Sequence, residues 1–281
     1  MKKFLIIAGL LLVAFGIWYI NSQSVQPIQL PKPDAVDDLP VEAEKQVEKI
    51  DEPIVLSEAL VLPKTNADDV IIKRLAYTLS FNEKHEQAEW VAYTLSQSEV
   101  KGGAKRKDNF KADPDIETES AQLNDYKKSG YDRGHLAPAA DMSKNQKIMD
   151  ESFYMSNMSP QEPSFNRGIW KKLEEQVRNW TMTDTLLYVV TGPVLTDGLP
   201  TIGENGVSIP EYYYKIIADF SEPELKCIAF LMPNKKLKDP IYNFVVSIDS
   251  LEQVTGLDFY HLLPNNIEDS LEQTKDWIVW Q

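Results

Sequence analysis

Hydrophobic residues follow two different spacings along this chain, and each spacing predicts a different element. Segments 74–82 (RLAYTLSFN) and 88–96 (AEWVAYTLS) are rich in aromatic and β-branched residues, as strands are. The polar residues between them predict a turn, and we therefore expect a β-hairpin. A helix over 167–182 is predicted instead by apolar residues at helical spacing: Trp170, Leu173, Val177 and Trp180.

The remaining apolar segments predict further strands and helices. We expect strands at 153–157, 186–195, 211–220 and 226–233, a short helix near 144–152, and helices over 241–263 and 266–280. Strands and helices are interspersed without strict β–α alternation, which favours an α+β fold. Neither a repeat nor a linker follows residue 70, so we expect one domain over 67–281.

The N-terminus carries a membrane-targeting pattern. Lys2 and Lys3 precede the apolar run from Phe4 to Ile20, whose length lies between a signal peptide core and a spanning helix. We assign residues 1–22 to an uncleaved signal anchor, with a cleaved signal peptide as the alternative. Both place the body of the protein in the cell envelope, in the periplasm or outside the cell, either anchored or secreted.

Residues 23–66 differ in composition from the rest of the chain. They are acidic, rich in proline and free of aromatic residues, so they cannot bury enough surface to fold alone. We interpret them as a tether. The single cysteine, Cys227, excludes an internal disulfide and a cysteine-based zinc site.

The distribution of charge decides which partners are compatible. The chain has 43 acidic and 29 basic residues and a net charge of −14, which opposes binding to a polyanion. Between Lys101 and Arg178, however, 14 basic residues balance 13 acidic ones, and 101–107 (KGGAKRK) is a basic cluster. A substrate that carries phosphate is therefore compatible with this part of the chain.

A few polar residues form a pattern that can carry chemistry. His135 lies in YDRGHLAPAADM, and an unperturbed imidazole is largely neutral at pH 7, so it can act as a base. Asn166 precedes the predicted helix, and its amide oxygen suits a hard ion such as Mg²⁺. Taken singly, Asn166 is a helix N-cap, and Glu174 with Arg178 is a surface ion pair.

Three motifs in order resemble those of a known family. They are D-R-G-H at 132–135, S-N-M-S-P-Q at 156–161, and N-R-G-x-W-x-x-L-E at 166–174 followed by Arg178. They are similar to the motifs of the DNA/RNA non-specific endonucleases, the ββα-metal (His-Me finger) nucleases that include endonuclease G and secreted sugar-non-specific nucleases. The resemblance covers roughly 70–265 and implies a central, mainly antiparallel sheet flanked by helices.

The resemblance implies a role for each matching residue. His135 matches the general base, Asn166 the direct ligand of Mg²⁺, and Glu174 a carboxylate that holds the waters of the metal. Arg178 matches a group that stabilises the phosphoryl transition state, and Arg133 one that holds phosphate. The matches assigned to substrate binding are Arg106, Asn157 and Gln161, of which Arg106 fits the spacing of the family less closely.

The function implied is hydrolysis of DNA and RNA with Mg²⁺, for which Mn²⁺ can substitute, giving 5′-phosphate ends. Contacts to phosphate carry no sequence code, so cleavage is expected to be indiscriminate. The family includes homodimers, which makes a homodimer an expectation here. Two alternatives remain: an inactive, nuclease-like protein that binds nucleic acid or another partner at the envelope, and a phosphodiesterase for another exported phosphate ester.

Overall fold

The computed structural model describes residues 58–116, 121–184, 186–221 and 225–281. The predicted signal segment and most of the predicted tether lie outside these residues. Contacts divide the chain into residues 1–47 and 48–281, and everything described below belongs to the second unit. Within the described ranges, no helix combines the length and the hydropathy that a membrane span requires.

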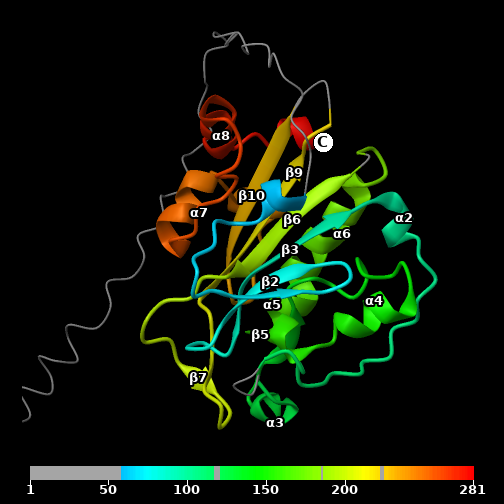
Figure 1. The fold of residues 1–281 in the computed structure, drawn as a ribbon, viewed down its shortest axis with the longest axis vertical. Helices are drawn as coiled ribbons and strands as arrows, with labels where there is room; N and C mark the ends of the chain where they lie inside the picture. Colours follow the sequence, from blue (N-terminus) through cyan, green and yellow to red (C-terminus); the bar gives the residue numbers. More distant parts are fainter. Residues whose placement is uncertain (1–57, 117–120, 185, 222–224) are drawn as a thin grey trace, which may run out of the picture. The chain divides into compact units, whose positions relative to one another are not determined.

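An antiparallel sheet forms the centre of the fold. In the described part of the chain it has seven strands in the order β1-β2-β3-β6-β9-β10-β11 (Figure 1). Every neighbouring pair is antiparallel. The strands are β1 (Val70–Lys73), β2 (Thr78–Asn82), β3 (Gln87–Leu95), β6 (Leu187–Pro193), β9 (Tyr212–Asp219), β10 (Lys226–Pro233) and β11 (Val245–Val246). This architecture confirms the predicted α+β class and its mainly antiparallel sheet.

Helices cover both faces of the sheet. On one face lie α5 (Pro163–Phe165), the π-helical turn η3 (Asn166–Trp170) and α6 (Lys171–Trp180), and on the other lie α7 (Ile248–Thr255) and α8 (Asn265–Glu272). Successive residues of a strand point to opposite faces. In β9, Tyr213 stacks on Phe165 with ring centroids 5.5 Å apart, and Tyr214 contacts Phe259 at 5.8 Å. Because both faces are covered, this strand is buried almost throughout.

Short elements complete the described part of the fold. The helical ones are η1 (Glu58–Val61), α2 (Gln97–Val100), α3 (Leu123–Tyr126), α4 (Gln146–Glu151), η2 (Met155–Asn157), η4 (Ile241–Phe244) and η5 (Ile278–Trp280). Two small hairpins pair β4 (Asp132–His135) with β5 (Met158–Gln161) and β7 (Thr201–Ile202) with β8 (Val207–Ser208). Only the first of these hairpins positions the residues of the predicted site.

The structure moves one predicted strand and divides another. The strand predicted at 153–157 is wrong, because those residues end in η2 and the strand β5 begins at Met158. Its position is set by pairing with β4, a long-range contact that local composition does not report. The segment 74–82 contains a turn, closed by a hydrogen bond from Arg74 N to Tyr77 O, before β2 begins.

The two C-terminal helices are shorter than predicted. In place of one helix over 241–263, the chain forms η4, β11 and α7, and α7 ends where Gly256 adopts a left-handed φ of 72°. The helix predicted over 266–280 ends as α8 at Glu272. At α7 a turn residue, rather than loss of amphipathic spacing, determines the end.

The first described element, η1, packs against the rest of the fold. Val61 is buried, and Lys64 donates its backbone N–H to the carbonyl of Asp258. Packing thus already involves residues N-terminal to position 67, where composition placed the start of the domain. The boundary of the tether itself stays a prediction.

Candidate active site

The predicted motifs fold into one ββα unit. Strand β4 pairs with β5 so that His135 lies opposite Met158 and Asp132 opposite Gln161. The chain then turns directly into α5, η3 and α6. The hairpin therefore carries His135, the following helix carries Asn166, and the two side chains arise from adjacent elements although 31 positions separate them in the sequence.

A single cavity of about 860 Å³ collects the predicted site residues. Six of them line it: Arg106, Arg133, His135, Asn166, Glu174 and Arg178. They come from the loop before α3, from strand β4 and from the η3–α6 helix. The convergence of His135 and Asn166 on the same cavity is the feature that a shared catalytic site requires.

His135 is held as a buried, neutral imidazole. It is 8% exposed, and its ring packs against the rings of Phe110 and Phe153 at centroid distances of 5.6 Å and 4.9 Å. Its Nε2 has no hydrogen-bond partner among the described residues. Burial, followed by the charges of Arg106 and Arg133, lowers the pKa of His135 to about 3. The imidazole is therefore neutral at neutral pH, as a general base must be.

Asn166 is not the helix N-cap that its position in the sequence suggested. It has helical dihedral angles, and the capping side chain is Glu162, which accepts a hydrogen bond from Phe165 N at 2.8 Å. Asn166 instead donates its side-chain Nδ2 to Asp132 Oδ2 at 2.9 Å. A carboxylate only accepts, so this bond fixes the orientation of the amide. Its Oδ1 is left to bind a ligand.

Asp132 lines the same cavity, although the sequence pattern gave it no role. Besides Asn166, it accepts hydrogen bonds from Arg167 Nε at 2.8 Å and Arg167 Nη2 at 2.6 Å. It thus fixes the π-helical turn that carries Asn166 onto strand β4, and π-helical turns are frequent at functional sites. The sequence feature that could have identified Asp132 is its position as the first residue of the D-R-G-H motif.

Arg178 has a different partner from the one its spacing suggested. The surface ion pair with Glu174 does not form. Arg178 Nη1 pairs with Asp141 Oδ1 at 2.7 Å, and Tyr93 donates its hydroxyl to Asp141 Oδ2 at 2.8 Å. Asp141 is buried, so this network holds the guanidinium at the cavity wall. Asp141 lies in the YDRGHLAPAADM motif, but sequence spacing gave it no partner.

The half-buried Glu174 and the buried Lys215 carry opposite charges and lie near each other beside Arg178. Burial raises the pKa of Glu174, and the charge of Lys215 opposes that rise. Lys215 is almost fully buried in β9, its Nζ is 5.0 Å from the centroid of the Trp170 ring, and within the described residues it has no hydrogen-bond partner. Burial lowers its pKa. A lysine inside the apolar strand EYYYKIIADF was the available signal.

Two arginines frame the imidazole at the mouth of the cavity. The guanidinium of Arg133 lies 4.2 Å from the centroid of the Phe110 ring, and that of Arg106 lies 5.3 Å from the Phe153 ring. Arg106 also donates Nε to Asp108 at 2.7 Å, and its side chain is 54% exposed. Both arginines therefore present positive charge to a ligand that enters beside His135.

Asn157 and Gln161 do not reach the cavity, which corrects their assignment to substrate binding. Both are fully buried. Asn157 donates Nδ2 to the carbonyls of Ala137 and Ser152 at 2.9 and 2.8 Å, and its Oδ1 accepts from Ala137 N at 2.9 Å. These bonds fix the chain just after His135, so Asn157 positions the base from behind.

Gln161 packs across β4 at its glycine. A Cβ at position 134 would lie 2.2 Å from Cδ of Gln161, so only glycine leaves room for this amide. The Gly of D-R-G-H is thereby explained by packing between the paired strands. Gln161 therefore packs between the paired strands and does not line the cavity.

The comparison with known proteins agrees with this geometry. The profile of the DNA/RNA non-specific endonucleases matches residues 60–266. The chain belongs to this family. The ββα unit is the ββα-metal fold, and the protein is a nuclease, a hydrolase that acts on DNA or RNA.

Named relatives of this family cover most of the domain. A nuclease from Nostoc sp. is 34% identical over 225 residues, covering 76% of this chain and 81% of its own. Human mitochondrial endonuclease G is 34% identical over 201 residues, covering 66% and 68%. The crystal structure of the EndoG/EndoGI complex superposes with a TM-score of 0.69 at 32% identity, covering 75% of this chain and 94% of that chain.

Proposed function

We propose that this nuclease hydrolyses the phosphodiester bonds of DNA and RNA with His135 as general base and Mg²⁺ as cofactor, and that it leaves 5′-phosphate ends. The observation that supports this most directly is the shared cavity of His135, Asn166, Glu174 and Arg178. Hydrolysis needs a base for the proton of water and positive charge near the phosphoryl oxygens, and both are at hand.

His135 begins the reaction in this proposal. Its neutral imidazole removes a proton from water as the water oxygen bonds to phosphorus. The bond from phosphorus to the 3′ oxygen then breaks, and that oxygen takes a proton from solvent. The phosphate remains on the 5′ side. Phe110 and Phe153 hold the ring, and Asn157 fixes the backbone behind it.

The arginines hold and stabilise the phosphate. Arg106 and Arg133 flank the imidazole, where they can bind the non-bridging oxygens of the phosphate. Arg178, oriented by Asp141, supplies charge where negative charge increases as the new bond forms. These contacts address phosphate and not base edges, so we expect cleavage of many sequences and of both sugars.

The residues present fit a hard divalent cation. Asn166 offers an oriented amide oxygen, and Glu174 offers a carboxylate in the same cavity. Oxygen donors with few protein ligands suit Mg²⁺, and Mn²⁺ accepts the same donors. When bound, the cation supplies positive charge to the phosphoryl and leaving oxygens. Asp132 keeps the amide oxygen of Asn166 directed away from itself.

Digestion of plasmid DNA and of RNA by the whole protein tests the proposal. With Mg²⁺ the wild type should degrade both, and His135→Ala should lose at least about 100-fold in rate. His261→Ala is the matched control, because His261 does not line the cavity. Equal rates for wild type and His135→Ala would reject the role of His135.

Two further outcomes distinguish the alternatives. The net charge of −14 favours a binding protein without turnover, which would give a salt-sensitive complex with DNA and no product. Hydrolysis of small phosphate esters that is not inhibited by added DNA or RNA would indicate another kind of phosphodiesterase.

The chemistry of the product ends is tested separately. If a kinase labels the cleaved ends only after phosphatase treatment, those ends carry 5′-phosphates.

We also propose that the protein is exported and held at the envelope by residues 1–22, with residues 23–66 as its tether. The support is the sequence pattern of the N-terminus alone. Cell fractionation, with a variant that begins after residue 22, tests it. The homodimer is a proposal that follows from the family, and light scattering of the purified protein measures it.

A further inference from the structure

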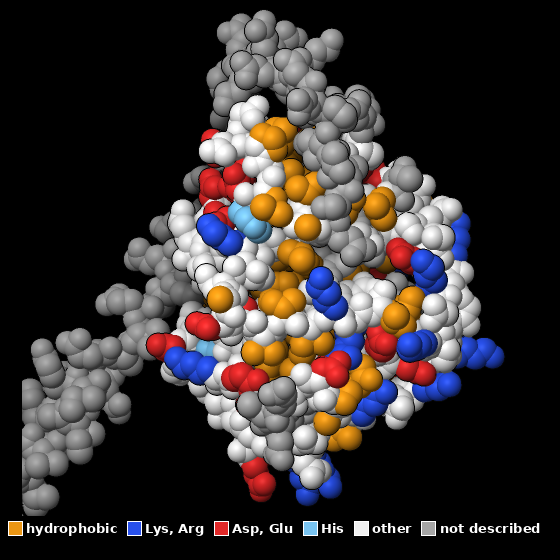
Figure 2. Space-filling view, viewed as in Figure 1, with side chains coloured by type: hydrophobic (Ala, Val, Ile, Leu, Met, Phe, Trp, Pro, Cys, Tyr) orange, Lys and Arg blue, Asp and Glu red, His pale blue; other side chains and the backbone are white. Residues whose placement is uncertain are grey.

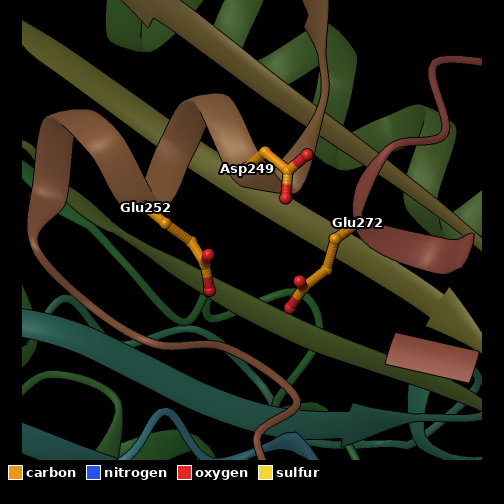
Figure 3. Close-up of side chains that lie close together, drawn as sticks. All are labelled: Asp249, Glu252 and Glu272. Carbon is orange, nitrogen blue, oxygen red and sulfur yellow. The ribbon is translucent and has the colours of Figure 1, made fainter. Parts of the chain in front are cut away.

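Three carboxylates gather on the opposite side of the sheet from the nuclease cavity. Asp249 and Glu252 lie on α7, and Glu272 lies at the end of α8. One oxygen from each carboxylate lies within 4.8 Å of the others. The three side chains extend from their two helices into the same space (Figure 3). None of them lines the cavity that contains His135.

Among the three carboxylates, that of Glu272 is the most buried and carries an oxygen without a hydrogen-bond donor in the described residues. Glu272 is 7% exposed, and that oxygen is its buried Oε1. Burial raises its pKa to about 8, and the charge of Glu252 adds to that rise. Burial of an isolated carboxylate is unfavourable unless a proton or a cation neutralises it. The carboxylate of Glu272 extends toward the other two carboxylates (Figure 3).

Neighbouring side chains do not neutralise the cluster. Over the described ranges, neither lysine nor arginine forms an ion pair with Asp249, Glu252 or Glu272. Lys64, the nearby cation, pairs with Asp258 at 2.8 Å. Acidic side chains gather on the surface over α7 and α8 (Figure 2). The local field therefore attracts a cation.

The geometry of Glu252 is already fixed for coordination. Its Oε1 accepts a hydrogen bond from Phe259 N at 2.8 Å, which directs the carboxylate. The same loop leads from Gly256 to Tyr260, whose pKa is raised first by burial and then by the nearby charges of Cys227 and Glu272. The helices α7 and α8 thus bring the three carboxylates close together, and no hydrogen bond between these carboxylates is formed in the described residues.

We propose that Asp249, Glu252 and Glu272 bind one divalent cation, Ca²⁺ in preference to Mg²⁺, which joins α7 to α8. Hard cations take carboxylate oxygens. Ca²⁺ binds them at about 2.3–2.6 Å, so opposite ligands lie about 5 Å apart, whereas Mg²⁺ at about 2.1 Å allows about 4 Å. Ca²⁺ also accepts irregular geometry and completes its shell with water. The role of this site is structural, since it lies away from the nuclease cavity.

Thermal unfolding of the whole chain carrying Asn166→Ala tests the proposal, because this background removes the proposed ligand of the nuclease cavity. Saturating Ca²⁺ should raise Tm by about 5 °C or more over chelator, and Mg²⁺ should raise it less. Glu272→Gln and Asp249→Asn should each abolish the shift. The control Asp239→Asn, an exposed acid elsewhere, should keep it.

The Tm measured in chelator distinguishes the loss of a cation site from a general loss of stability in the variant. Without cation and above pH 8, where Glu272 is ionised, Glu272→Gln removes an unpaired buried charge, so its Tm should equal or exceed that of the parent. Calorimetric titration with Ca²⁺ should give a single site that this variant lacks. A parent Tm that does not respond to Ca²⁺, or a shift retained in Glu272→Gln, overturns the proposal. Nuclease activity with Mg²⁺ should be unchanged in Glu272→Gln, whichever way the nuclease test falls.

Discussion

Asp132 Oδ2 accepts a hydrogen bond from Asn166 Nδ2 at 2.9 Å, and this contact joins the first letter of one motif to the first letter of another. It orients the amide so that the carbonyl oxygen is available as a ligand. The carboxylate also receives two hydrogen bonds from Arg167. Asp132 is therefore the residue that converts Asn166 from a polar side chain in a helix into an oriented donor of oxygen.

Replacement Asp132→Ala should weaken metal binding more than catalysis. Without the acceptor, the Asn166 amide can rotate, and loss of a supporting hydrogen bond to a metal ligand costs about 10- to 100-fold in affinity. The Mg²⁺ concentration for half-maximal rate should rise by that factor. Arg167→Ala, which leaves the bond to Asn166 intact, is the control. An unchanged Mg²⁺ dependence in Asp132→Ala would contradict the orienting role.

The pH dependence of the rate should follow Glu174 and not His135. Burial lowers the pKa of His135 to about 3, so the base stays neutral down to acid pH. Burial raises the pKa of Glu174, so protonation of this carboxylate should reduce the rate first as pH falls. Mg²⁺ binds the ionised form, so more Mg²⁺ should move this acid limb to lower pH. Rate profiles at two Mg²⁺ concentrations measure the shift, and an acid limb that stays fixed would count against Glu174.

Lys215 should tune that same limb without contacting substrate. Its positive charge lowers the pKa of Glu174, so Lys215→Met should raise it and move the acid limb to higher pH. The fold should tolerate methionine, because removal of a buried ammonium relieves its desolvation. Lys226→Met on the adjacent strand is the control, since Lys226 pairs with Asp184. Identical pH profiles for Lys215→Met and wild type would remove this role.

Asn157→Ala should act mainly on stability. The variant leaves the backbone groups of Ala137 and the carbonyl of Ser152 without their buried partner, at a cost of about 2–4 kcal/mol. Tm should fall by about 5–15 °C. The exposed Asn179→Ala serves as the matched control. If the KM for DNA rises while Tm stays constant, Asn157 contacts substrate, and the positioning role inferred from the structure is wrong.

Periodicity located the main elements because it depends on local chemistry alone. The helical stripe that contains Trp170 and Leu173 is buried in α6 and η3, and the strands at 186–195, 211–220 and 226–233 form β6, β9 and β10. Pairing partners were not local. The strand that pairs with β4 was therefore placed too early, and the C-terminal helices were extended through turns that Gly256 and the following loop impose.

The sequence by itself determined the family and the fold class, because ordered motifs encode chemistry directly, and six of the eight site residues that it predicted line one cavity. Only the tertiary structure showed which residues orient the side chains of the site. Asp132 orients Asn166, Asp141 holds Arg178, and Lys215 reaches Glu174 from a strand distant in sequence. These partners follow from burial and three-dimensional distance, and neither quantity can be read from spacing along the chain.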